Sequence, residues 1–139
     1  MLPPGTKKGA LPRPFSFLLG IYFAATIAHF THNAEFIAYY PNMPPSITRE
    51  TVYVAWLAIA SVGVAGLVAA RFGLRALGAL LLGVYGALGL DALQHYTLAL
   101  CSEHTLAANL TIWCEAAAGI LLAVASAGLF FRIRHEEAH

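Results

Sequence analysis

Four long stretches of the chain are almost entirely apolar, and short polar or proline-containing segments separate them. The stretches cover residues 15–40, 51–71, 74–100 and 105–132. None of them alternates apolar and polar residues as a half-buried strand does, and each is far longer than a barrel strand. A helix needs about 20 residues to cross the roughly 30 Å apolar layer of a bilayer. The pattern therefore predicts four membrane-spanning helices.

The segments between the stretches contain residues that end helices and start them. The sequence PNMPP at residues 41–45 cannot continue a helix, because proline lacks an amide hydrogen and clashes with the preceding turn. Ser46 or Thr48 can cap the helix that follows. We expect residues 1–14 to form a flexible tail and residues 133–139 a short C-terminal tail.

The composition favours lipid as the surrounding solvent. Charged residues make up 11% of the 139 residues, hydrophobic residues make up 59%, and the mean hydropathy is +0.69. Soluble domains contain about 25% charged residues, so this chain has too few to cover itself with a polar surface. The basic start also fits a signal peptide, but the first stretch is about 25 residues long and contains histidines and a glutamate, which favours a spanning helix. A net charge of +1 gives no reason to expect nucleic-acid binding.

The basic residues near the predicted loops are unequally distributed between the two ends of the bundle. Those expected at one end are Lys7, Lys8, Arg13, Arg71, Arg75, Arg132 and Arg134. Only Arg49 belongs to the loops at the other end. Because basic loops remain on the cytoplasmic side, the sequence predicts an all-α, four-helix transmembrane bundle over residues 15–132 with both termini in the cytoplasm. We expect it in the lipid bilayer of a bacterial cytoplasmic (inner) membrane.

Most of the other acidic, amide and histidine side chains belong to the outer halves of the predicted spans. They are His29, His32, Asn33, Glu35, Asp91, Gln94, His95, Asn109 and Glu115. An ionised carboxylate in the membrane costs at least about 2.5–3.5 kcal/mol, so such groups are paired, protonated or bound to a ligand. The distribution predicts one polar site that opens to the outer face. We expect Glu103 and His104, in the outer loop, to be ordinary loop residues.

Five of these residues are candidate metal ligands. They are His29, His32, Asp91, His95 and Glu115. The spacings of His29 with His32 and of Asp91 with His95 put each pair on one face of an α-helix. If the third and fourth helices form a hairpin, Asp91 lies level with Glu115. Mixed nitrogen and oxygen ligands suit a divalent zinc, iron, manganese or copper ion.

The sequence leaves several functions open for this site. A metal ion could activate water or oxygen toward a hydrophobic small-molecule substrate, with Glu35 or Glu115 as catalytic acid or base. Two histidines on different helices could ligate haem, although carboxylates beside the site fit haem less well. A histidine–carboxylate relay could carry protons or ions. The polar residues could also form a purely structural network in an accessory protein, within a homo-oligomer or against a membrane partner.

Overall fold

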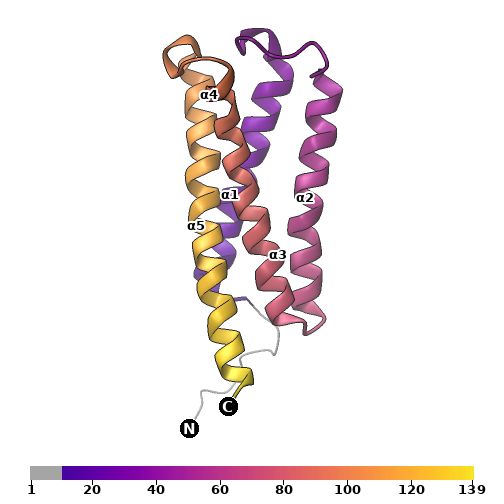
Figure 1. Ribbon diagram of the computed structural model, residues 1–139. Helices are drawn as coiled ribbons and strands as arrows, with labels where there is room; N and C mark the ends of the chain where they lie inside the picture. Colours follow the sequence, from indigo (N-terminus) through magenta and orange to yellow (C-terminus); the bar gives the residue numbers. More distant parts are fainter. Residues whose placement is uncertain (1–10) are drawn as a thin grey trace.

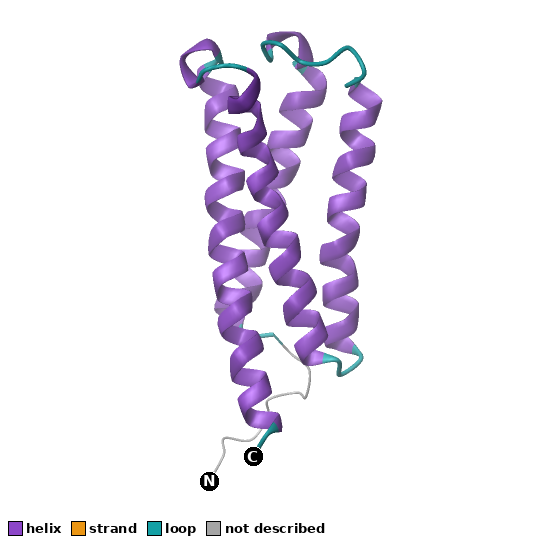
Figure 2. Cartoon of the chain, viewed as in Figure 1, coloured by secondary structure: helices purple, strands orange, loops and turns teal. Residues whose placement is uncertain are grey.

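The computed structural model describes residues 11–139, and all regular structure in that part of the chain is helical (Figure 2). The elements are α1 (Arg13–Glu35), η1 (Ile37–Tyr39), α2 (Arg49–Arg71), α3 (Arg75–Leu88), η2 (Gly89–Gln94), α4 (His95–Leu98), η3 (Cys101–Glu103) and α5 (Leu106–Glu137). The η elements are 3₁₀ helices. The first ten residues of the predicted N-terminal tail lie outside the described residues.

Four helical segments are long and apolar enough to cross a membrane, as the sequence predicted. They are Arg13–Glu35, Arg49–Arg71, Arg75–Leu98, which runs through α3, η2 and α4, and Leu106–Glu137. The first segment ends at Glu35, before the predicted limit at residue 40, because the chain turns into η1. The last segment continues to Glu137, so most of the predicted C-terminal tail is helical.

The four segments form an up-and-down bundle in which consecutive segments run in opposite directions (Figure 1). Helix α1 packs against α2 and α5, and α3 packs against the same two neighbours. The start of α1, the α2–α3 turn and the end of α5 lie at one end of the bundle, which we call the terminal end. The loop between α1 and α2 and the loop before α5 lie at the opposite end, which we call the loop end.

Glycine residues allow the backbones of α3 and α5 to touch near the middle of the bundle. A Cβ atom added to Gly86 would lie 2.7 Å from the carbonyl oxygen of Gly119, and one added to Gly119 would overlap the carbonyl oxygen of Gly86. The fully buried Tyr22 of α1 packs against both backbones and donates a hydrogen bond to the Tyr85 carbonyl at 2.8 Å. This contact holds α1, α3 and α5 together next to the polar residues of the loop end.

A 3₁₀ segment interrupts the third span immediately after this contact. The backbone of Gly89 lies against the ring of Tyr22, where an added Cβ would be 2.8 Å from Cε2. From Gly89 to Gln94 the chain winds with about three residues per turn instead of 3.6. The change in winding alters which side chains of this segment face the bundle interior.

Replacing Gly119 by alanine should weaken the bundle, because the added methyl group forces two backbones apart. We expect a loss of about 1–3 kcal/mol in the free energy of unfolding, measured by titrating the detergent-solubilised protein with SDS. The matched control is Gly20→Ala, because a Cβ at Gly20 has no other atom within 4 Å. An equal loss in both variants would contradict the packing described for Gly119.

Candidate functional site

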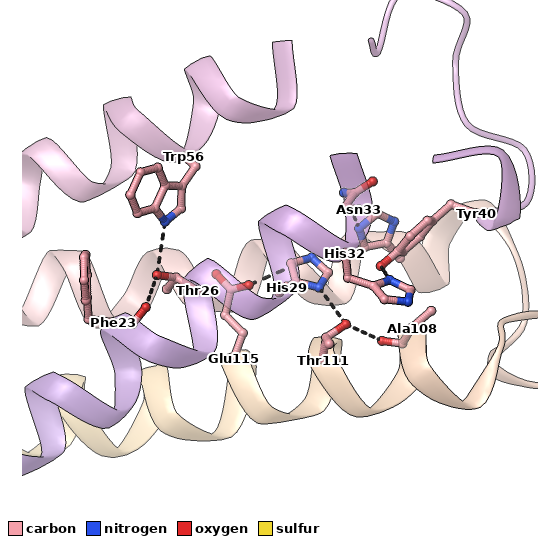
Figure 3. A network of polar contacts seen from close by, with 11 residues as sticks. Phe23, Thr26, His29, His32, Asn33, Tyr40, Trp56, Ala108, Thr111 and Glu115 are labelled. Carbon is pink, nitrogen blue, oxygen red and sulfur yellow. Dashed lines mark hydrogen bonds and ion pairs between the residues drawn. The ribbon is translucent and has the colours of Figure 1, made fainter. Parts of the chain in front are cut away.

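Polar side chains from α1, α4, α5 and the connecting loops meet inside the bundle near the loop end (Figure 3). We call this group the histidine cluster; its members are His29, Asn33, Tyr40, His95, His104, Thr111 and Glu115. All but the half-buried Thr111 are less than a tenth exposed, and Glu115 is only 1% exposed. The sequence predicted that His29, His95 and Glu115 would come together, and the structure places them in one cluster.

The buried face of α1 carries His29 and Asn33 into the bundle. Tyr22, Thr26, His29 and Asn33 are all buried, and their spacings of three and four residues place them on one side of the helix. Thr26 accepts a hydrogen bond from the indole nitrogen of Trp56 at 3.3 Å, which links this face to α2. The buried face of α1 therefore becomes more polar toward the loop end.

The hydrogen bonds of Thr111 favour one tautomer of the His29 ring. If the Thr111 hydroxyl donates to the Ala108 carbonyl at 3.0 Å, its oxygen can accept from Nδ1 of His29, 3.3 Å away. In the tautomer that satisfies both contacts, His29 carries its hydrogen on Nδ1 and its Nε2 has a free lone pair. Figure 3 shows the His29 ring between Thr111 and Glu115.

The free lone pair of His29 faces a carboxylate oxygen. Nε2 of His29 and Oε2 of Glu115 are 3.9 Å apart, too far for a direct hydrogen bond. Oε2 of Glu115 is buried and has no hydrogen-bond partner among the described residues. A carboxyl oxygen and an imidazole nitrogen thus face each other without a hydrogen bond in an apolar bundle, an arrangement that favours a proton or a cation between them.

His95 packs directly against His29 and Tyr40. The ring centres of His95 and His29 are 5.3 Å apart, and those of His95 and Tyr40 are 4.7 Å apart. Nε2 of His95 lies 3.2 Å from the side-chain nitrogen of Asn33. His95 is therefore held in place by His29 and Asn33 of α1 and by Tyr40 in the loop that follows α1.

Tyr40 joins the cluster to His32, which is half-buried at its edge. Burial raises the pKa of Tyr40 to about 12, so its phenol stays protonated at neutral pH. The hydroxyl can then donate to Nδ1 of His32, 2.8 Å away. The structure thus brings His32 near the cluster through Tyr40, a residue that sequence reasoning did not select.

His104 is a cluster member and not the ordinary loop residue that the sequence suggested. It is 7% exposed, and its Nδ1 donates to the Leu100 carbonyl at 3.0 Å. Its Nε2 is buried without a hydrogen-bond partner among the described residues. Asn109 fixes this loop by donating to the Cys101 carbonyl at 2.9 Å. In the sequence, the only sign that this loop is ordered was Asn109, a polar residue at the start of an apolar span.

Asp91 does not share a buried face with His95. It is exposed and accepts a hydrogen bond from Gln94 at 3.4 Å. In an α-helix the two side chains would be about 40° apart, but the 3₁₀ winding of η2 separates them by about 120°. The sequence analysis assumed regular α-helix through this segment, and the 3₁₀ turn removes the pairing.

Glu35 lies at the loop end but is bound to α2 instead of the cluster. Its Oε1 is 2.8 Å from Nη2 of Arg49 and accepts a hydrogen bond from the Tyr53 hydroxyl at 2.7 Å. The carboxylate is exposed and has a structural partner. Of the two predicted acid–base residues, only Glu115 therefore lies in the cluster.

The predicted metal ligands do not form a ready coordination shell. Within residues 11–139, no three His, Cys, Asp or Glu side chains are grouped closely enough to hold a metal ion. What the structure brings together is the His29–Glu115 pair, with the rings of His95 and His104 next in line.

Comparisons with protein-family profiles, curated proteins and solved structures gave no match.

The hydrogen bonds predict that His29 and His104 both carry hydrogen on Nδ1. We expect ¹⁵N NMR of histidine-labelled protein to show two rings in this tautomer, assigned by loss of their signals in His29→Gln and His104→Gln. In Thr111→Val, which keeps the shape but removes the acceptor, the His29 signals should shift and those of His104 should not. Nε2–H tautomers for both rings in the wild type would contradict the hydrogen-bond assignment.

Proposed function

We propose that the chain is an integral membrane protein whose His29–Glu115 pair, beneath the outer face of the membrane, binds a divalent transition metal ion. The surface of the spans supports a lipid environment. Large apolar side chains that are at least 44% exposed occur on every helix of the spans, for example Phe17, Phe23, Val54, Leu57, Leu80, Leu121 and Val124. In water such continuous apolar exposure would favour aggregation.

The charges at the two ends support an orientation with the terminal end in the cytoplasm. Five described arginines belong to that end, namely Arg13, Arg71, Arg75, Arg132 and Arg134. The loop end has Arg49, which is paired with Glu35. Because basic residues remain on the cytoplasmic side, the loop end and its histidine cluster would face outward.

The observation that carries the metal proposal is the buried Oε2 of Glu115, which has no hydrogen-bond partner among the described residues and faces Nε2 of His29. Metal-bound nitrogen and oxygen atoms lie about 2.0–2.2 Å from a zinc ion, so two ligands in tetrahedral geometry are about 3.4 Å apart. Nε2 of His29 and Oε2 of Glu115 are 3.9 Å apart, so the two side chains would need to approach by only about 0.5 Å. Glu115 follows the start of α5 by nine residues, about 14 Å along the helix, where an unpaired charge would be costly.

His29 has a hydrogen-bond partner of the kind that orients metal-binding histidines. A metal-binding histidine usually donates its other ring hydrogen to an acceptor, which orients the ring. Thr111 provides that acceptor for His29, and the Leu100 carbonyl does the same for His104. We therefore propose His95 or His104 as the third ligand, recruited by a small side-chain movement when the ion binds.

A mixed nitrogen and oxygen ligand set suits zinc, iron, manganese or copper. With protein ligands filling only part of its shell, the ion would act as a Lewis acid toward a molecule in the remaining position. A site beneath the outer face would be reached through the lipid, which favours a hydrophobic small-molecule substrate. Glu35 and Asp91, both exposed, have no place in this ligand set.

Two alternatives are less compatible with the packing. Haem between His29 and His95 would have to separate rings whose centres are 5.3 Å apart. Transport through the bundle would have to cross an apolar core toward the terminal end, formed by Phe15, Ala79, Leu82, Leu122, Leu129 and Ile133. A one-sided binding site requires neither change.

Metal content tests the proposal. Protein purified in detergent without chelators should contain near-stoichiometric transition metal by plasma mass spectrometry, and Glu115→Gln should lose it. Thr111→Val, which removes only the oxygen that orients the His29 ring, should weaken metal affinity about 10–100-fold. Glu50→Gln and His135→Gln are matched controls, because both residues are exposed and neither belongs to the histidine cluster. Metal retained in a folded Glu115→Gln protein, or absent from the wild type, would overturn the metal site.

The native cysteines test the orientation. Cys101 is free and exposed in η3 at the loop end. A membrane-impermeant maleimide should label it in intact cells, and Cys101→Ser should abolish the labelling. In the Cys101→Ser background, a cysteine added after His139 should react only after the cells are permeabilised. The reverse pattern would place the histidine cluster on the cytoplasmic side.

A further inference from the structure

A second site lies at the terminal end, far from the histidine cluster. An apolar groove of about 350 Å³ runs between the start of α1 and the later part of α5. Its lining includes Phe15 and Leu18 from α1, and Ala125 and Gly128 from α5, with Arg132 at one end. The volume is at the lower end of the range for small-molecule sites.

The absence of a side chain at Gly128 keeps the groove open. A Cβ atom added there would have no neighbouring atom within 4 Å, so the gap does not arise from close helix packing. Pro12 and Pro14 belong to the wall on the α1 side, together with Phe15 and Leu18. The groove is therefore lined by apolar side chains and the backbone of Gly128, with one cationic side chain.

The position of Arg132 matches the headgroup layer of the proposed membrane. Arg132 follows Leu106 by 26 residues, about 39 Å along the helix. This exceeds the roughly 30 Å of hydrocarbon but lies within the 40–45 Å that include the headgroups. Arg13, which starts α1 beside the groove prolines, belongs to the same level.

Arg132 also lacks a carboxylate partner among the described residues, unlike its neighbours. Arg75 pairs with Glu136 at 3.4 Å, and Arg134 pairs with Glu137 at 3.2 Å. The segment before residue 11 contains two lysines and no acidic residue, so it does not supply an anion either. A cation beside an apolar groove at this depth is complementary to an anionic amphiphile.

We propose that this groove binds one anionic phospholipid of the inner leaflet, with the phosphate at Arg132 and an acyl chain along Phe15, Leu18 and Gly128. The lipid would fill the space between α1 and α5 at the terminal end. This inference rests on the proposed membrane insertion and does not depend on the metal site.

Native mass spectrometry of the full chain, released from detergent with added phosphatidylglycerol or phosphatidylcholine, tests the proposal. The wild type should retain one phosphatidylglycerol in preference to phosphatidylcholine. Arg132→Gln should lower that preference about fivefold, the effect of one cation near a headgroup. Gly128→Leu, whose side chain fills the groove, should remove the tightly bound lipid whatever its headgroup.

Two matched variants complete the design. Gly20→Leu adds the same side chain on α1 where its Cβ has no neighbour within 4 Å, and Arg134→Gln removes an arginine that is paired with Glu137. Both should bind lipid as the wild type does. Equal losses in the controls, unchanged binding in Gly128→Leu, or displacement by inorganic phosphate alone would overturn the groove. Metal content should be unaffected in all four variants, so the groove and the metal site can fail independently.

Discussion

The structure depends on a carboxylate held inside an apolar bundle opposite an imidazole lone pair. Glu115 is 1% exposed and His29 is 2% exposed, and a carboxyl oxygen of the one faces a ring nitrogen of the other across 3.9 Å. Burial of an unpaired charge is among the most costly events in a protein interior, more so in a membrane. The remaining features are consistent with this constraint: α1 and α5 pack closely, Thr111 orients the imidazole, and further histidines surround the pair. A proton or a cation between the two groups would satisfy both, and the proposed metal ion is such a cation.

The two ends of the bundle have different chemistry, and the glycine contact between α3 and α5 separates them. Toward the loop end, polar side chains from three helices meet inside the bundle. Toward the terminal end, the interior is apolar apart from the buried Ser126 hydroxyl, and the charges lie at the helix ends. Because Gly86 and Gly119 allow backbone contact, Tyr22 can pack across both helices below Glu115. The same packing holds the cluster in place on one side and leaves the groove near Gly128 on the other.

Hydropathy alone predicted the number and approximate limits of the spans, because a 20-residue apolar run has few alternatives to a membrane-length helix. Helical periodicity and the position of each residue along its span predicted that His29 and Glu115 share one site. This prediction succeeded because both residues lie on regular α-helices. It failed for Asp91, because nothing in the local sequence indicates that η2 winds as a 3₁₀ helix against Tyr22. Tyr40 and His104 were missed for a different reason. Both follow irregular segments, and loop geometry does not follow from periodicity.

The protonation state of Glu115 is the most direct test of the central claim. Infrared spectra of the wild type are recorded with metal bound and again after chelation. Subtracting the spectrum of Glu115→Gln from each of them isolates the bands of the Glu115 side chain and reports whether it is ionised. The account predicts carboxylate bands with metal bound and a protonated carboxylic-acid band after chelation. A protonated carboxylic acid in both states, with no response to the metal, would show that a proton satisfies the pair and would contradict the metal site.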